Sequence, residues 1–146
     1  MSDLLRLSNP VFRTLAICTG ALTLKMVVIT GMTIRKRFQT GTFANAEDAK
    51  RDGQIVGTND DVERCRRNHL NDLESIPPFV LIGLMYTLTD PDEDVAIWHF
   101  RIFTASRLLH MIAYQAALPQ PSRALTFLTG LGCTTSMAIQ TIRNAL

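Results

Sequence analysis

Side chains that could bind a charged ligand are concentrated in residues 63–74, which read ERCRRNHLNDLE and lead directly into the apolar run IPPFVLIGLMY. If this stretch is helical, Arg67, Asn71 and Glu74 share one face, because residues three or four apart lie side by side on a helix. A guanidinium, an amide and a carboxylate can bind carboxylate, peptide and ammonium groups. The stretch is therefore either a solvated helix end or a site for a charged ligand at a membrane surface.

A second polar face and an isolated arginine occur nearer the C-terminus. Arg107, His110 and Tyr114 recur at spacings of three and four residues, so they share a helical face. Arg123 follows a Pro-Gln-Pro break, close to the start of the last expected helix, where the helix dipole favours negative charge. These groups suit an anionic, peptide-like ligand. The alternative is structural: an Arg107–Glu74 ion pair, a core histidine and an interfacial tyrosine.

The composition favours a protein that lies in a membrane. Hydrophobic residues make up 47% of the 146 residues and charged residues only 19%, below the roughly 25% usual for soluble domains. Residues 11–34 are almost all apolar or small, and about 20 such residues span a bilayer as a helix. Lys25 lies deep in this segment, so we expect it to face the protein interior with a partner.

Four helices are expected, at about residues 11–35, 61–89, 94–118 and 122–145, with a cytosolic loop at about 36–60. The short second and third connections favour an antiparallel bundle. The turn at 90–94 is acidic, whereas the first loop and its flanks hold most of the basic residues, which places that loop in the cytosol. These basic residues are Arg35, Lys36, Arg37, Lys50, Arg51, Arg64, Arg66 and Arg67. The expected fold is all-α, an integral membrane antiparallel four-helix bundle, with a soluble bundle as the alternative.

Several other classes of function do not fit the sequence. The net charge is only +2 and no basic patch is interleaved with aromatic residues, so no nucleic-acid partner is expected. Cys18, Cys65 and Cys133 are odd in number and far apart, which matches neither a disulfide framework nor a metal site. No short apolar segment with a cleavage site occurs at the N-terminus, so we expect a retained membrane anchor rather than a signal peptide.

The polar stretch belongs to a longer motif, VERCRRNHLNDLESIPPF at residues 62–79, which resembles the signature of the membrane-associated proteins in eicosanoid and glutathione metabolism. The shorter segments FANAED at 43–48, HFRIF at 99–103 and LPQPSRAL at 118–125 also resemble that family, in the same order. The resemblance thus covers nearly the whole chain. Within the family it points to the microsomal glutathione transferases of type one.

This resemblance implies a transmembrane subunit that assembles as a homotrimer in the endoplasmic reticulum membrane, and in the mitochondrial outer membrane as a further location. Glutathione would lie between neighbouring subunits, its thiolate attacking hydrophobic electrophiles that arrive from the lipid bilayer, with glutathione-dependent reduction of lipid hydroperoxides as a second activity. Carried over by motif position, the glutathione-binding residues would be Arg37 (from the adjacent subunit), Arg67, Asn71, Glu74, His110 and Tyr114. Arg123 would lie nearest the thiol as the catalytic residue, and Arg107 would be the partner of Glu74.

Two alternatives stay open. The first is an isomerase similar to the microsomal prostaglandin E synthases. These enzymes belong to the same family and have similar motifs. Those enzymes carry Ser and Arg where this chain has Ala124 and Leu70, which favours the transferase, whereas Cys65 and Asp48 also fit the synthase. Ala49 stands where the resemblance to the transferases implies a reactive cysteine, which argues against thiol-dependent activation. The second alternative is a non-catalytic lipid-binding scaffold.

Overall fold

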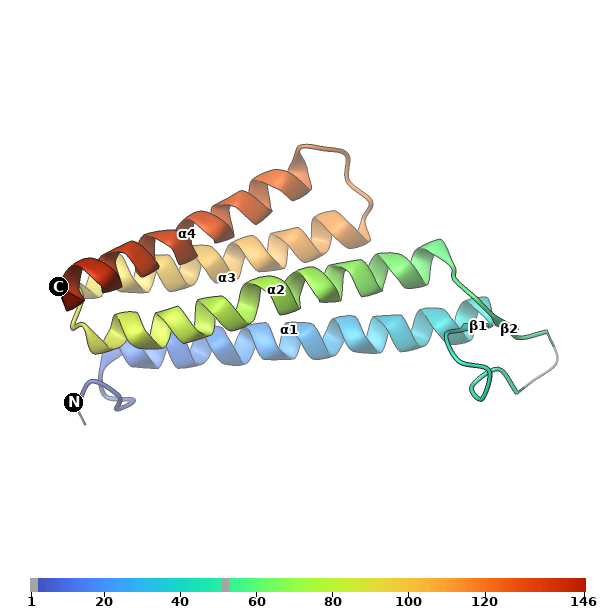
Figure 1. Ribbon diagram of the computed structural model, residues 1–146, viewed down its shortest axis with the longest axis horizontal. Helices are drawn as coiled ribbons and strands as arrows, with labels where there is room; N and C mark the ends of the chain where they lie inside the picture. Colours follow the sequence, from blue (N-terminus) through green and yellow to red (C-terminus); the bar gives the residue numbers. More distant parts are fainter. Residues whose placement is uncertain (1–2, 51–52) are drawn as a thin grey trace.

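The computed structural model describes residues 3–50 and 53–146, and its four long helices run alternately in opposite directions along one axis (Figure 1). The helices are α1 (Pro10–Thr40), α2 (Asp60–Leu88), α3 (Glu93–Gln115) and α4 (Ser122–Ala145). The all-α, four-helix fold expected from the sequence is confirmed. Arg51, which was counted among the basic residues of the first loop, lies outside the described residues.

The ends of α1 follow from its capping residues. Asn9 accepts hydrogen bonds from the backbone N–H groups of Val11 (2.9 Å) and Phe12 (3.2 Å), and Pro10 occupies the first helical position. The helix continues past the expected end at residue 35 as far as Thr40, and Gly41 ends it with φ of 64°, a left-handed conformation that glycine adopts without strain. This long helix extends past the adjacent ends of α3 and α4, toward β1 and β2 (Figure 1).

The first loop is more ordered than the sequence suggested. Two short strands, β1 (Thr42–Phe43) and β2 (Ile55–Val56), pair in parallel within it. The Phe43 ring meets the Phe38 ring edge-on, with centroids 5.6 Å apart. The loop is therefore folded back on the end of α1.

The bundle is held by apolar side chains between the helices. α1 packs against α2 and α3, and α4 packs against α3 and α2, while α1 and α4 do not touch in the described part of the chain. The Phe79 ring stacks on the Phe103 ring at a centroid distance of 3.8 Å. At Gly83 an added Cβ would lie 2.9 Å from Leu15 Cδ1, so this glycine lets α1 approach α2 closely.

Many large apolar side chains lie on the outside of the bundle. More than half of the accessible surface of several large apolar side chains is exposed, on all four helices; they include Ile17, Leu24, Val27, Leu81, Leu109, Ile112, Leu125, Leu128, Ile139 and Ile142. Of the helices in the described residues, α1 is the one that could cross a membrane on length and composition alone, with a mean hydropathy of 1.8 in its most apolar part. Apolar surface this extensive is typical of proteins covered by lipid or by partner subunits.

Candidate functional site: a polar stripe beside a buried ionic cluster

Helix α2 carries polar residues on two adjacent faces. The predicted stripe is only partly covered: Arg67 and Glu74 are exposed and Asn71 is half-buried. Asn68 and Asp72, by contrast, are fully buried and lie in the same helical register as the core residues of α2. The stripe therefore lies at the edge of the packed interior, with a second, hidden polar row behind it.

The hidden row is the centre of an ionic cluster that joins three helices. Asp72 accepts a hydrogen bond from Lys25 Nζ of α1 and another from Arg107 Nη2 of α3, the latter at 2.9 Å. All three side chains are buried, with at most 2% of any of them exposed. Charges at such sites are unfavourable unless they are paired. Two cations and one anion leave the cluster with one net positive charge beside the stripe.

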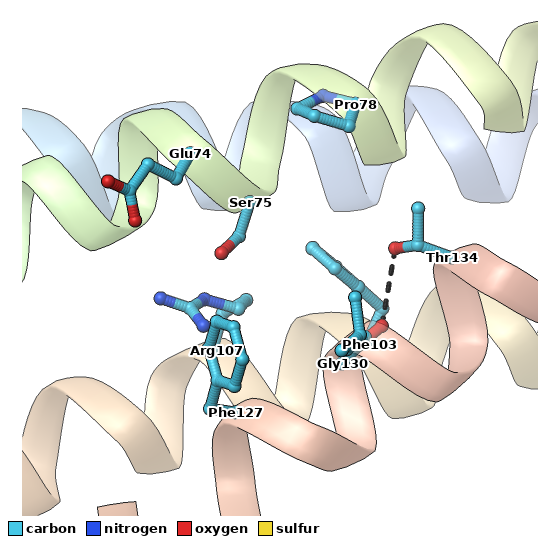
Figure 2. Close-up of a pocket in the computed structure, with 9 residues that line it drawn as sticks. Glu74, Ser75, Pro78, Phe103, Arg107, Phe127, Gly130 and Thr134 are labelled. Carbon is cyan, nitrogen blue, oxygen red and sulfur yellow. Dashed lines mark hydrogen bonds between the residues drawn. The ribbon is translucent and has the colours of Figure 1, made fainter. Parts of the chain in front are cut away.

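The structure corrects the expected pairing of Arg107. Its predicted partner was Glu74, but its ion pair is with Asp72, and the same Nη2 also donates to Asn71 Oδ1 at 2.5 Å. Glu74 lies across a cavity from the Arg107 guanidinium (Figure 2). The physical reason is the helical period: two residues correspond to about 200° around a helix, so Asp72 and Glu74 leave α2 on nearly opposite sides.

A second polar group lies where α3 ends and α4 begins. His110 Nδ1 is 3.2 Å from the backbone oxygen of Arg123 and 3.0 Å from Thr126 Oγ1. Because a carbonyl oxygen only accepts, Nδ1 carries the proton when this bond forms. The Arg123 guanidinium lies 5.1 Å from the centroid of the Tyr114 ring, a cation–π contact. The structure thus brings Arg123 to His110 and Tyr114, the two α3 residues that were expected to share a face.

A cavity of about 200 Å³ lies between α2, α3 and α4, below the stripe. Its charged end is formed by Glu74 and Arg107, and its remaining walls are largely apolar, with Phe103, Phe127 and Gly130 among them (Figure 2). Pockets that enclose a small-molecule ligand usually have volumes of about 300–1,000 Å³. This cavity by itself is therefore too small to enclose a ligand the size of a tripeptide.

Arg37 does not join the other candidate residues within one chain. It lies on α1 in an open groove of about 370 Å³, whose other lining residues include Thr33, Arg66, His69 and Leu70. All residues that line this groove belong to α1 and α2, so it is separate from the group around Arg123 on α3 and α4. Of the predicted set, the structure joins Arg107 to Asn71, groups His110 and Tyr114 with Arg123, and leaves Arg37 apart.

Reasoning from the sequence missed Asp72 as the centre of the cluster and left Lys25 without a partner. A signal was available: Asn68, Asp72, Ile76 and Phe79 follow one another at spacings of three and four residues, so the two polar residues share the core register. A lysine at membrane depth needs an acid, and an acid in a core register is the matching candidate.

The fold and site define a helical bundle with a lipid-like exterior and a polar site at its edge, the class of membrane-embedded helical proteins. The chain belongs to the MAPEG family, a membrane-embedded family whose model matches residues 15–143. This is the family of membrane-associated proteins in eicosanoid and glutathione metabolism, so the family predicted from the motifs is confirmed.

Curated relatives come from two branches. Microsomal glutathione S-transferase 1 of Mus musculus is 42% identical over 153 residues, covering 100% of this chain and 99% of that protein. The protein of the same name from Bos taurus is 44% identical over 146 residues, covering 96% and 94%. Prostaglandin E synthase of Homo sapiens is 39% identical over 142 residues, covering 95% and 93%. This chain is thus similar over its full length to members of both branches.

Proposed function

We propose that this protein is a membrane-bound glutathione transferase, which conjugates the glutathione thiolate to hydrophobic electrophiles and reduces lipid hydroperoxides with the same thiol. In this proposal the protein is a homotrimer of the endoplasmic reticulum membrane. Its similarity to microsomal glutathione S-transferase 1 of several mammals, over nearly the full length of each chain, supports the assignment.

The observation that carries the proposal is the placement of the Arg123 guanidinium. It lies over the Tyr114 ring, and the Arg123 backbone is hydrogen-bonded to His110 at the start of α4. A thiol has an ordinary pKa of about 8.5, and the thiolate is the nucleophile. A fixed cation beside the sulfur lowers that pKa by stabilising the anion. Because a guanidinium does not give up its proton near neutral pH, Arg123 acts electrostatically and not as a base.

The polar stripe supplies groups that match the rest of the tripeptide. Glutathione has two carboxylates, an ammonium group and two peptide bonds. In the proposed complex Arg67 binds a carboxylate, Glu74 binds the ammonium group, and Asn71 binds a peptide or carboxylate group. The single net positive charge of the buried cluster further favours an anionic ligand at this edge of the bundle.

The trimer is proposed because one chain does not complete the site. The cavity beside Glu74 and Arg107 holds about 200 Å³, and Arg37 lies in a separate groove. A neighbouring copy that brings its own Arg37 to the stripe would close the site and cover exposed apolar surface at the same time. The electrophile, which is soluble in lipid, would then enter from the bilayer.

The test is a direct measurement of binding and conjugation. Full-length protein in detergent is titrated with glutathione in a calorimeter and then assayed with a chloronitroarene as the electrophile. We expect saturable binding and thioether formation. Protein that is folded and trimeric but binds no glutathione would refute the proposal and favour the lipid-binding scaffold. The number of sites per trimer follows from the same titration.

Isomerisation of a prostaglandin endoperoxide is the second candidate, because prostaglandin E synthases are 38–39% identical to nearly the whole of this chain. The same preparation is incubated with the endoperoxide and glutathione. Formation of prostaglandin E faster than in the protein-free control would establish that activity. The transferase is preferred because this chain has Leu70 and Ala124, where the resemblance to the synthases implies Arg and Ser.

A further inference from the structure

The amide of Asn71 has a defined orientation. Arg107 Nη2 lies 2.5 Å from Asn71 Oδ1. A guanidinium has only donors, so the group of Asn71 that faces it has to be the carbonyl oxygen. The two N–H donors of Asn71 then lie at the opposite edge of the planar amide group, away from Arg107, and the residue is half-buried at the edge of the stripe. Asn71 therefore turns its hydrogen-bond donors away from Arg107, while its carbonyl oxygen is engaged by that guanidinium.

The orientation of Arg107 depends in turn on Asp72. The nitrogen that donates to Asn71 also donates to Asp72 Oδ1 at 2.9 Å, and the other oxygen of Asp72 accepts from Lys25 Nζ. The side chains of Lys25, Asp72, Arg107 and Asn71 are thus linked in a row of hydrogen bonds. The row runs from α1 to α2, on to α3, and back to α2. The side chains of Lys25, Asp72 and Arg107 are each at most 2% exposed, so water does not compete for these bonds.

We propose that Asp72, braced by Lys25, is a positioning residue for glutathione: through Arg107 it holds the Asn71 amide with its N–H groups directed at an acceptor oxygen of the tripeptide. Neither Asp72 nor Lys25 touches the ligand in this arrangement. The inference rests on the proposed function, since it names the group through which the same site recognises its substrate. The matching ligand atom is a peptide carbonyl or carboxylate oxygen of glutathione.

Whether the loss of Asp72 weakens or strengthens glutathione binding distinguishes a positioning role from a direct electrostatic role. Removing the negative charge of Asp72 makes the neighbourhood more positive, which by itself strengthens the binding of an anionic ligand. If Asp72 acts by positioning, its loss frees Arg107 and with it the Asn71 amide, which weakens binding. A hydrogen bond that involves a charged group contributes about 1.5–3 kcal/mol, which corresponds to a loss of roughly 10- to 100-fold in affinity.

Two variants of equal net charge test the proposal. Lys25→Met/Asp72→Asn keeps a carbonyl oxygen that can accept from Arg107, whereas Lys25→Met/Asp72→Leu offers no acceptor. We expect the asparagine variant to bind glutathione within about 3-fold of the wild type, and the leucine variant at least about 10-fold more weakly. Calorimetry on the full-length trimer gives both dissociation constants. Equal affinities of the two variants would overturn the proposal.

A thermodynamic cycle with Asn71→Ala shows whether the effect passes through Asn71. In that background the asparagine and leucine variants should bind glutathione equally, because the amide that Arg107 orients is gone. The same tenfold difference in both backgrounds would mean that Asp72 acts by another route and would overturn the proposal. Steady-state assays add a second readout, since loss of positioning raises KM for glutathione and leaves kcat nearly unchanged.

Controls cover folding and the parent hypothesis. Asp61→Asn removes another carboxylate of α2, one that is exposed and paired with Lys36 at 2.9 Å, and should leave affinity unchanged. If the leucine variant fails to fold, Arg107→Lys replaces it. The shorter lysine side chain keeps a positive charge near Asp72 but does not hold the Asn71 amide. The affinity for glutathione should therefore fall in the wild-type background and not in the Asn71→Ala background. Absence of glutathione binding by the wild type would refute the proposed function itself, an outcome distinct from those above.

Discussion

The guanidinium carbon of Arg123 lies 5.1 Å from the centroid of the Tyr114 ring, so the first turn of α4 is tied to the last turn of α3 by a cation over an aromatic face. Such a contact contributes about 0.5–2 kcal/mol, enough to restrict a long side chain to one region. His110 strengthens the connection from one turn further back on α3, where it contacts the Arg123 backbone. A positive charge is thereby held at the edge of the site.

Replacing Arg123 by alanine should lower kcat for conjugation by about 10²- to 10³-fold, the usual cost of losing one stabilising group for a developing anion. The bound thiol should also ionise at higher pH, toward its ordinary pKa of about 8.5, because the cation that lowers it is gone. The variant's deficit should therefore shrink as pH rises. The pH–rate profile and the ultraviolet absorbance of the bound thiolate measure both effects.

The matched control for that substitution is Arg143→Ala, which removes an exposed arginine from the opposite end of α4. Its kcat and pH profile should equal those of the wild type. Arg123→Lys keeps the charge on a more flexible chain and should retain part of the activity. Full activity of Arg123→Ala would refute the role assigned to this residue.

His110 should contribute to the activity through the hydrogen bond that its Nδ1–H donates. His110→Asn keeps a donor near the position of Nδ1, whereas His110→Phe keeps only the ring and leaves the Arg123 carbonyl and Thr126 hydroxyl without that partner. We expect the phenylalanine variant to lose more kcat, and to shift the pH midpoint for thiolate formation further upward, than the asparagine variant. Equal losses in the two variants would show that the hydrogen bond to Arg123 is not what matters.

Close packing of α3 on α4 depends on Gly130. An added Cβ there would lie 3.0 Å from Ser106 Oγ and 3.5 Å from Phe103 Cε2. Gly130→Ala should therefore destabilise the protein, within the range of about 1–3 kcal/mol typical of overpacking. Thermal unfolding in detergent measures the effect. Adding Ser106→Ala should restore most of the stability, because it removes the nearest atom.

The neighbouring Gly132 is the control for this prediction. A Cβ added at Gly132 would meet no atom of another helix within 4 Å among the described residues. Gly132→Ala should therefore not lower the unfolding temperature. Alanine is favoured over glycine inside a helix by about 1 kcal/mol, so a small rise is expected. A loss at Gly132 equal to that at Gly130 would mean that contact with Ser106 is not the cause.

Asn68 is a buried polar residue whose side-chain oxygen and nitrogen have no hydrogen-bond partner among the described residues. An unsatisfied buried group destabilises a fold by about 1–3 kcal/mol. Asn68→Leu, which is similar in shape, should therefore raise the unfolding temperature. Thr87→Val is the comparison, because the Thr87 hydroxyl is also buried but donates to the Gly83 carbonyl at 2.8 Å. An unfolding temperature of Asn68→Leu no higher than that of the wild type would contradict the prediction.

Local features of this protein are readable from the sequence because they depend on neighbours along the chain. Apolar length and breaks at proline and glycine indicate four helices, and the helical period places Arg67, Asn71 and Glu74 on one face. The ends are less accurate, since α1 continues to Thr40 and α3 stops at Gln115. The family, too, is readable from contiguous motifs, since its signature lies within one stretch of α2.

Contacts between helices were decided only by the tertiary structure. Asp72 meets Lys25 across 47 residues and Arg107 across 35 residues, and the sequence analysis assigned Arg107 to Glu74 instead. The helical period determines which residues of one helix share a face, but the rotation and axial shift of each helix in the bundle determine which faces meet. Those two quantities result from the summed packing of many side chains, such as Phe79 on Phe103 and Leu15 on Gly83.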